Sequence, residues 1–194
     1  MSRIAVIGSG ISGLAAAYYL SRRHDVFLFE KEARLGGHTH TVTIESSAGP
    51  LGIDTGFIVH NDRTYPNLVR LLADASLLPR RHWAQASWNY HLEPKARNSA
   101  MLTYNMNRLQ SLAVKERYCA TLNADGSIDP SKVLRKLVYH HPLYTRAAIR
   151  AQARWAEISG KNRTHYCGAY WFYGFHEDGL NSARRVASSL GINL

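Results

Sequence analysis

The feature that most constrains this chain is a glycine-rich turn close to its N-terminus. An apolar run over residues 4–7, typical of a parallel strand buried on both faces, leads directly into the turn. Good helix formers follow over 14–20, and a second apolar run covers 26–29. The glycines have the spacing G-x-G-x-x-G and are Gly8, Gly10 and Gly13. This order predicts a strand–turn–helix–strand unit and an α/β fold with a Rossmann-like parallel sheet.

Each glycine has a physical reason to be in such a turn. Gly8 allows the tight bend, Gly10 lets a pyrophosphate approach the backbone, and Gly13 lets the helix lie close to the sheet. The N-terminus of the helix then offers free N–H groups and a positive dipole end to phosphates. Glu30 closes the second strand, where a carboxylate can accept hydrogen bonds from ribose hydroxyls. The pattern favours dinucleotide binding over the alternative, an ordinary βα loop.

A second glycine pair follows this acid. Residues 34–39 read Arg-Leu-Gly-Gly-His-Thr, so backbone and guanidinium could meet a diphosphate there. Together with the first turn, this run resembles the superfamily of flavin-containing amine oxidases, protoporphyrinogen oxidases and phytoene desaturases. The resemblance implies FAD rather than NAD as the cofactor. His38 is a departure, because the commonest form of the superfamily's motif has Arg at this position.

Two further stretches carry the same resemblance. Residues 54–57, Asp-Thr-Gly-Phe, match a motif that in the superfamily places backbone beside the isoalloxazine ring. Residues 164–183 resemble its C-terminal flavin motif, in which a strand ends in a glycine, here Gly168, and a helix follows. The resemblance places the amino end of that helix at the pyrimidine side of the flavin, where its dipole stabilises negative charge. The alternative interpretation is that the aromatic residues of this stretch only pack in the hydrophobic core.

The resemblance to one flavoprotein subgroup stops at about residue 75 and resumes from about residue 79. In that subgroup the two blocks are far apart, and the segment between them holds most of the substrate domain. The chain is therefore interpreted as both ends of a flavoprotein joined without its middle. Sheet edges exposed at such a junction, beside Trp83, Trp88 and Tyr90, predict self-association and marginal stability.

This interpretation divides the chain into three parts. Residues 1–78 form the N-terminal FAD-binding part, and 79–160 are a truncated, β-rich remnant of the substrate domain. Residues 161–194 form a strand–loop–helix that completes the FAD-binding domain. Further strands are expected at 41–45, 51–53, 86–92, 101–105, 118–122 and 133–139, and helices at 65–75 and 145–158.

Charge and composition narrow the class of protein. The net charge of +10 comes entirely from residues 79–194, but the basic residues are spread along that segment, which disfavours a nucleic-acid partner. The glycines and serines within the uncharged run 4–20 argue against a signal peptide, and no apolar run elsewhere is long enough for a transmembrane segment. Cys119 and Cys167 lack metal-ligand spacing, which favours a reduced, cytoplasmic setting.

No nucleophile–base pair and no metal cluster stands out in the sequence, which fits chemistry carried by a cofactor. The resemblance implies two-electron oxidation of an unidentified small-molecule substrate by FAD. Two alternatives remain: a non-catalytic remnant that binds a nucleotide or nothing, and an NAD(P)-dependent oxidoreductase.

Catalytic residues are not identified from the sequence, and no metal is expected. The residues expected at the cofactor come from the motifs above. They are Gly8, Ser9, Gly10, Ser12, Gly13, Glu30, Lys31, Arg34, Gly36, Gly37, His38, Thr39, Gly56, Phe57, Gly168, Ala169, His176, Glu177, Asp178 and Gly179.

Overall fold

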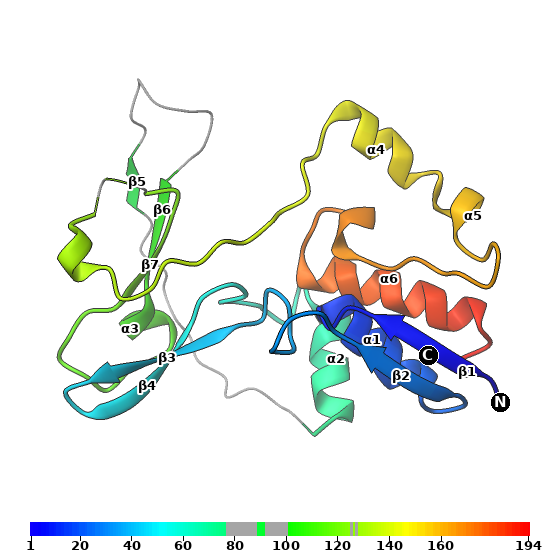
Figure 1. Ribbon diagram of the computed structural model, residues 1–194, viewed down its shortest axis with the longest axis horizontal. Coiled ribbons are helices and arrows are strands. Elements are labelled where there is room, and N and C mark those ends of the chain that lie inside the picture. The colour runs from blue at the N-terminus through cyan, green and yellow to red at the C-terminus, as the bar shows by residue number, and fades with distance from the viewer. Residues whose placement is uncertain (77–88, 92–100, 125, 127) are drawn as a thin grey trace. The chain divides into compact units, whose positions relative to one another are not determined.

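The computed structural model describes residues 1–76, 89–91, 101–124, 126 and 128–194 (Figure 1). The chain forms two compact units: the first comprises 1–39, 60–79 and 140–194, and the second comprises 40–59 and 80–139. Most of the expected junction, including Trp83 and Trp88, lies outside the described residues. The three-part division concerns the relation of this chain to a longer flavoprotein, and it stays a prediction.

The first unit opens with the strand–turn–helix–strand arrangement that the sequence predicts. β1 (Arg3–Ile7) and β2 (Asp25–Phe29) are parallel neighbours, and α1 (Ile11–Leu20) connects them (Figure 1). Val6 is buried, whereas the side chains of Ile7 and Phe29 are 87% and 56% exposed. The sheet is therefore buried on one face, although the apolar runs predicted burial on both, because only two strands pair here.

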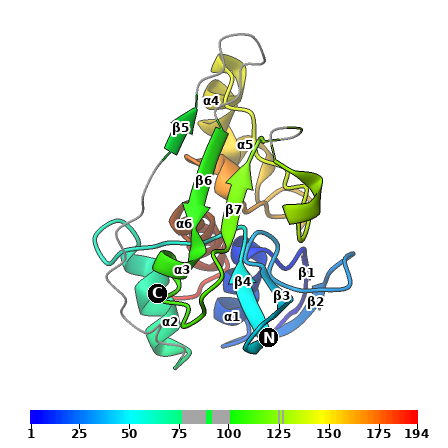
Figure 2. The same ribbon diagram turned by 90° about the vertical axis from the view of Figure 1, so that its left-hand side faces the viewer.

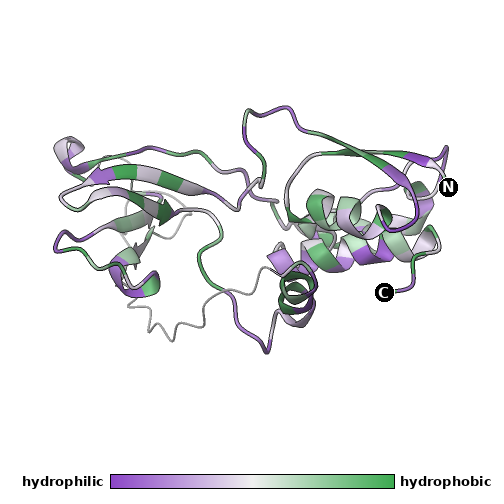
Figure 3. Ribbon diagram, turned by 90° about the horizontal axis from the view of Figure 1, so that it is seen from below, coloured by the Kyte–Doolittle hydropathy of each residue, from purple (hydrophilic) through white to green (hydrophobic). Residues whose placement is uncertain are grey.

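Three helices form the core of the first unit. α1 and α2 (Pro66–Asp74) both pack against α6 (His176–Ser189). Small side chains allow the close approach, since a Cβ added at Gly179 would lie 2.7 Å from Ile11 Cγ2. Figure 3 shows hydrophobic and hydrophilic residues on different parts of these helices, as expected when one side is buried. The fully buried residues of α1 and α6 include Ala15, Leu180, Ala183 and Ala187.

The segment before α6 differs from the expectation. Two short helices, α4 (Arg146–Gln152) and α5 (Trp155–Ile158), replace the single helix expected over 145–158. In the described chain no strand leads into Gly168, although the sequence predicted one. The N–H of Gly168 donates instead to Ser182 Oγ at 3.0 Å, so a side chain of α6 takes the place of a sheet neighbour.

The second unit is built from β-strands (Figure 2). β3 (Thr41–Ser46) and β4 (Gly49–Asp54) form an antiparallel hairpin. A second antiparallel sheet has the order β5-β6-β7, with strands Asn89–His91, Met101–Asn105 and Cys119–Leu122. The short helix α3 (Met106–Leu109) follows β6, and a 3₁₀ helix covers Pro130–Lys132.

The prediction of a strand over 133–139 is wrong. This segment pairs with no strand among the described residues, and a β-type pattern is stable only when a neighbouring strand satisfies its backbone. Its last residue is nevertheless anchored: the hydroxyl of Tyr139 lies 2.8 Å from His40 Nδ1 and 2.7 Å from Thr55 Oγ1.

Two further properties of the described ranges bear on function. None of their helices has the length and apolar character needed to cross a bilayer. Their His, Cys, Asp and Glu residues form no group of three that could hold a metal ion. Cys119 and Cys167 are both free thiols.

Candidate dinucleotide-binding site

The first glycine turn adopts a geometry in which its glycines have different tasks. Gly8 has φ +95°, and its N–H donates to Phe29 O at 2.7 Å, which ties the turn to β2. A Cβ added at Gly13 would lie 1.8 Å from Gly8 O, so α1 can pack on the turn only with glycine there. At Gly10, the residue before α1, an added Cβ would have no atom of the described residues within 4 Å. Gly10 therefore faces open space.

Glu30 lies beside this turn and organises it. Its Oε2 accepts from Ser9 N at 2.8 Å and from Ser9 Oγ at 2.7 Å, and its Oε1 accepts from Glu32 N at 3.0 Å. The Glu32 N–H, followed by the Ser9 hydroxyl and N–H, lowers the pKa of Glu30 to about 2. The carboxylate is thus ionised at neutral pH. The backbone N–H of Lys31 acts on this pKa in the same direction to a smaller extent, so several protein donors surround this carboxylate.

The second glycine turn packs directly on the first. Gly36 N–H lies 3.0 Å from Ser9 O and 3.2 Å from Ser9 Oγ. A Cβ added at Gly37 would lie 2.9 Å from Gly10 Cα. The structure therefore brings Gly8–Gly13, Glu30 and Gly36–Gly37 together. They form a cradle at the N-terminus of α1, where the first N–H groups have no partner within the helix.

Arg34 supports this second turn from within. One guanidinium nitrogen donates to Gly37 O at 2.6 Å, and the other lies 3.3 Å from Leu35 O and 3.4 Å from Thr39 O. The guanidinium therefore holds the loop carbonyls, whereas the sequence suggested direct contact with a diphosphate. Lys31 points into solvent and pairs only loosely, at 3.5 Å, with Glu32.

The C-terminal motif meets the second turn at Thr39 and His176. Thr39 Oγ1 lies 3.1 Å from Nε2 of His176, the first residue of α6. Burial, with a smaller contribution from the charge of His38, lowers the pKa of His176 to about 4. The imidazole is therefore neutral at pH 7, and Nε2 can accept from the threonine hydroxyl. The ring of His38 packs against His141 with centroids 4.9 Å apart.

The two acids at the start of α6 already have partners in the protein. The buried carboxylate of Glu177 accepts from Asn67 N at 3.0 Å, Asn67 Nδ2 at 2.7 Å and Leu68 N at 2.9 Å. These groups lie at the start of α2, so Glu177 caps that helix from a distance. Asp178 Oδ2 accepts from Phe175 N at 3.0 Å and caps α6 itself. Both acids support the fold around the cradle.

The remaining expected residues fall into two groups. Gly179 lies against the start of α1, because a Cβ added there would lie 2.8 Å from Ser12 Oγ and 3.6 Å from Ala169 Cβ, whereas Gly168 is bound by Ser182 of α6. Gly56 and Phe57 belong to the second unit, and their role at the cofactor stays a prediction. The sequence did not point to Asn67 or Ser182, which connect α6 to its neighbours. Pro66 at the first position of α2 indicates where that helix starts, but not what it contacts.

Comparison with known proteins supports a nucleotide-binding assignment. Residues 6–75 match the family model described as an NAD(P)-binding Rossmann-like domain. A stretch of 41 residues is 54% identical to protoporphyrinogen oxidase 2, chloroplastic/mitochondrial, of Arabidopsis thaliana, covering 21% of this chain and 8% of that protein. The chain thus matches only a small fraction of this relative's length.

Two solved structures are also similar. A protoporphyrinogen oxidase-like protein from Exiguobacterium sp. 255-15 gives a TM-score of 0.32 at 26% identity, over 46% of this chain and 19% of that protein. A putrescine oxidase variant gives a TM-score of 0.28 at 18% identity, over 83% of this chain and 29% of that protein. These TM-scores are too low to establish a shared overall fold.

The sequence match and the geometry together define the class: the chain begins with a dinucleotide-binding Rossmann-like domain, built on β1, α1 and β2. Within that class, the match to the Arabidopsis relative agrees with the predicted resemblance to the amine oxidase and protoporphyrinogen oxidase-like superfamily.

Proposed function

We propose that this chain binds FAD, with the ADP part of the cofactor in the cradle. The observation that carries the proposal is the open space in front of Gly10, at the N-terminus of a ten-residue helix. A pyrophosphate there would receive hydrogen bonds from the first N–H groups of α1 and the favourable field of its dipole. The ionised carboxylate of Glu30, beside this turn, is the acceptor proposed for a ribose hydroxyl.

The flavin end of the cofactor would then extend towards Thr39 and His176. Neutral His176 and the Thr39 hydroxyl offer polar atoms at the start of α6, which fits the pyrimidine edge of a flavin better than a phosphate. When bound, FAD supplies two-electron transfer, and the protein orients it and excludes water. We propose the oxidation of a small-molecule substrate, with substrate and catalytic residues unassigned. Gly56 and Phe57 remain proposed flavin contacts.

A non-catalytic nucleotide-binding remnant is the second candidate. It is favoured by the small share, 8%, of the Arabidopsis relative that the chain matches. An NAD(P)-dependent oxidoreductase is the third, and the name of the matching family model is compatible with it. The packing of the second glycine turn on Gly10 supports FAD over this alternative, as part of the superfamily's motif.

A direct binding experiment separates these candidates. The purified apoprotein is titrated with FAD, FMN, NAD and NADP by calorimetry, and bound flavin is followed by its absorption after gel filtration. Retained FAD, with no binding of NAD, supports the proposal. Tight binding of NAD or NADP alone would overturn it. Bound FAD that no amine or porphyrinogen substrate reduces under anaerobic conditions would favour the non-catalytic remnant.

The proposal also includes the relation of this chain to a longer flavoprotein, its cellular setting and its self-association. We propose that the chain lacks the middle of a longer flavoprotein and that it works in the cytoplasm, with Cys119 and Cys167 reduced. Burial raises the pKa of the Cys167 thiol to about 11. The thiol therefore stays protonated at neutral pH and is a poor nucleophile. Self-association through the junction stays a prediction, because most of residues 76–92 lies outside the described ranges.

A further inference from the structure

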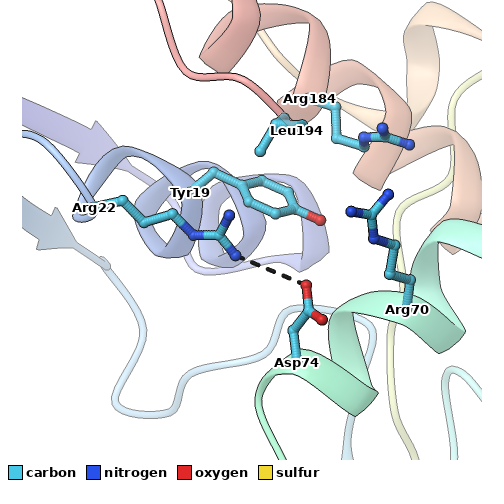
Figure 4. Close-up of a pocket in the computed structure, with 6 residues that line it drawn as sticks. All are labelled: Tyr19, Arg22, Arg70, Asp74, Arg184 and Leu194. Carbon is cyan, nitrogen blue, oxygen red and sulfur yellow. Dashed lines mark ion pairs between the residues drawn. The ribbon is translucent and has the colours of Figure 1, made fainter.

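Three arginines from three different elements meet around one tyrosine at the far end of α1 (Figure 4). Arg22 follows α1, Arg70 lies in α2, and Arg184 lies in α6. The guanidinium of Arg22 lies over the ring of Tyr19, 5.4 Å from its centroid. Figure 4 shows the other two guanidinium groups on the hydroxyl side of that ring. Asp74 and Leu194 complete the lining of the hollow.

The cluster has more hydrogen-bond donors than acceptors. Asp74 is the one acidic side chain among the described residues that line the hollow, and it pairs with Arg22 at 3.8 Å. Arg184 donates to Asn67 Oδ1. Arg70 makes no hydrogen bond or ion pair with the residues that the structure describes. Three guanidinium groups therefore share the hollow with the carboxylate of Asp74, and an anion bound there would reduce the repulsion between them.

Tyr19 adds a further donor of a different kind. Its side chain is buried, so the hydroxyl is held in place by the packing of α1 against its neighbours. Burial raises the pKa of Tyr19, while Arg184 and Arg22 act in the opposite direction. The hydroxyl therefore stays protonated at neutral pH and can donate to an oxyanion.

We propose that this arginine cluster, formed by Arg22, Arg70 and Arg184 around Tyr19, is a binding site for a phosphate group. A phosphate dianion is opposite in charge to the three guanidinium groups, and its oxygens accept from guanidinium groups in pairs. Arg22 and Arg70 are exposed, so a ligand can reach both from solvent. The site does not depend on the dinucleotide cradle, because α1 separates the two by its length of about 15 Å.

The test uses the whole chain and inorganic phosphate as the probe. Thermal melting is followed in sodium phosphate and in sodium chloride of the same ionic strength, and the dissociation constant is measured by calorimetry. We expect phosphate to raise the melting temperature above that in chloride. Arg70→Gln should weaken phosphate roughly tenfold or more, and Tyr19→Phe should weaken it by less. Arg150→Gln, which removes an exposed charge from α4, is the matched control and should change nothing.

Three further comparisons test the proposed phosphate site. Equal melting temperatures in phosphate and chloride, or equal losses in Arg70→Gln and Arg150→Gln, would overturn the proposal. Vesicles of phosphatidylcholine with phosphatidic acid distinguish a lipid phosphate from a free one, and Arg70-dependent binding of either supports the site. FAD affinity is measured on the same variants. FAD affinity should be unchanged in Arg70→Gln. The experiment can therefore reject the phosphate site without rejecting the proposed FAD site.

Discussion

Gly10 and Gly13 show that two glycines of one motif can be required for unrelated reasons. At Gly13 an added Cβ would collide with Gly8 O at 1.8 Å, whereas at Gly10 it would meet only open space. We therefore expect Gly10→Val to fold normally and to lose FAD, because the side chain would occupy the place of the pyrophosphate. Circular dichroism and FAD titration measure the two properties separately.

Gly13→Val is the contrasting variant, since it should lose folding and binding together. A Gly10→Val protein that retains FAD as well as the parent would show that the phosphate loop is misassigned.

Glu30 combines two tasks, because it holds Ser9 and also faces the expected ribose position. Glu30→Ala should weaken FAD by about ten- to a hundredfold, the scale of one hydrogen bond to a charged group. The matched control is Glu32→Ala, which removes a neighbouring exposed acid and keeps the backbone N–H that Glu30 uses. Calorimetric titration with FAD measures the affinity of both variants. Equal FAD affinities of Glu30→Ala and Glu32→Ala would show that Glu30 is not part of the site.

His176 makes stability depend on pH. Its pKa is about 4 in the folded protein and near the ordinary 6.5 in the unfolded chain. Below pH 6.5 the unfolded chain therefore binds a proton that the folded protein excludes. Stability should fall as the pH is lowered from 6.5 towards 4. His38, whose pKa is also lowered by burial and by His141, acts in the same direction.

Urea unfolding at several pH values measures this effect. The wild-type midpoint should fall between pH 7 and pH 4.5, and the midpoint of His176→Gln should fall less steeply. Parallel curves for the two proteins would contradict the assignment of this pH dependence to His176.

At the scale of elements, the carboxylate of Glu177 binds the start of α2, a helix that has no capping side chain of its own. Glu177→Gln should lower the free energy of unfolding by about 1–3 kcal/mol, because buried N–H groups lose an ionised acceptor. Glu157→Gln, an exposed acid paired with Arg154, is the control and should cost little. Equal losses in urea unfolding would show that the cap of α2 contributes no special stability.

The elements also show how far local sequence predicts structure. β1, α1, β2, β3, β6 and α2 form where periodicity and turn residues predicted them, because each has a strong pattern within a few residues. The segment 133–139 has an equally suggestive pattern but pairs with no strand in the described chain. The helix expected over 145–158 divides into α4 and α5, with Arg154 at the position just before α5 and no side-chain cap there.

At the scale of the whole molecule, the two compact units should respond differently to the cofactor. FAD at about a hundred times its dissociation constant stabilises the unit that binds it by about 2.7 kcal/mol. We therefore expect FAD to shift the melting of the first unit, which holds the cradle, more than that of the second unit, which holds only the proposed contacts Gly56 and Phe57. Differential scanning calorimetry, with tryptophan fluorescence as a second probe, resolves the two transitions. A single transition that shifts as a whole would show that the units unfold together.

The sequence by itself determined the dinucleotide-binding turn, its acid and its second glycine pair, because these depend on spacings within forty residues. Tertiary structure decided what the other charged side chains do. Arg34 holds loop carbonyls, and Glu177 caps a helix that begins 111 residues before it in the chain. The arginine cluster around Tyr19 likewise exists only where α1, α2 and α6 pack together. Hydrogen-bond partners so distant in sequence leave no local pattern, and only packing brings them into contact.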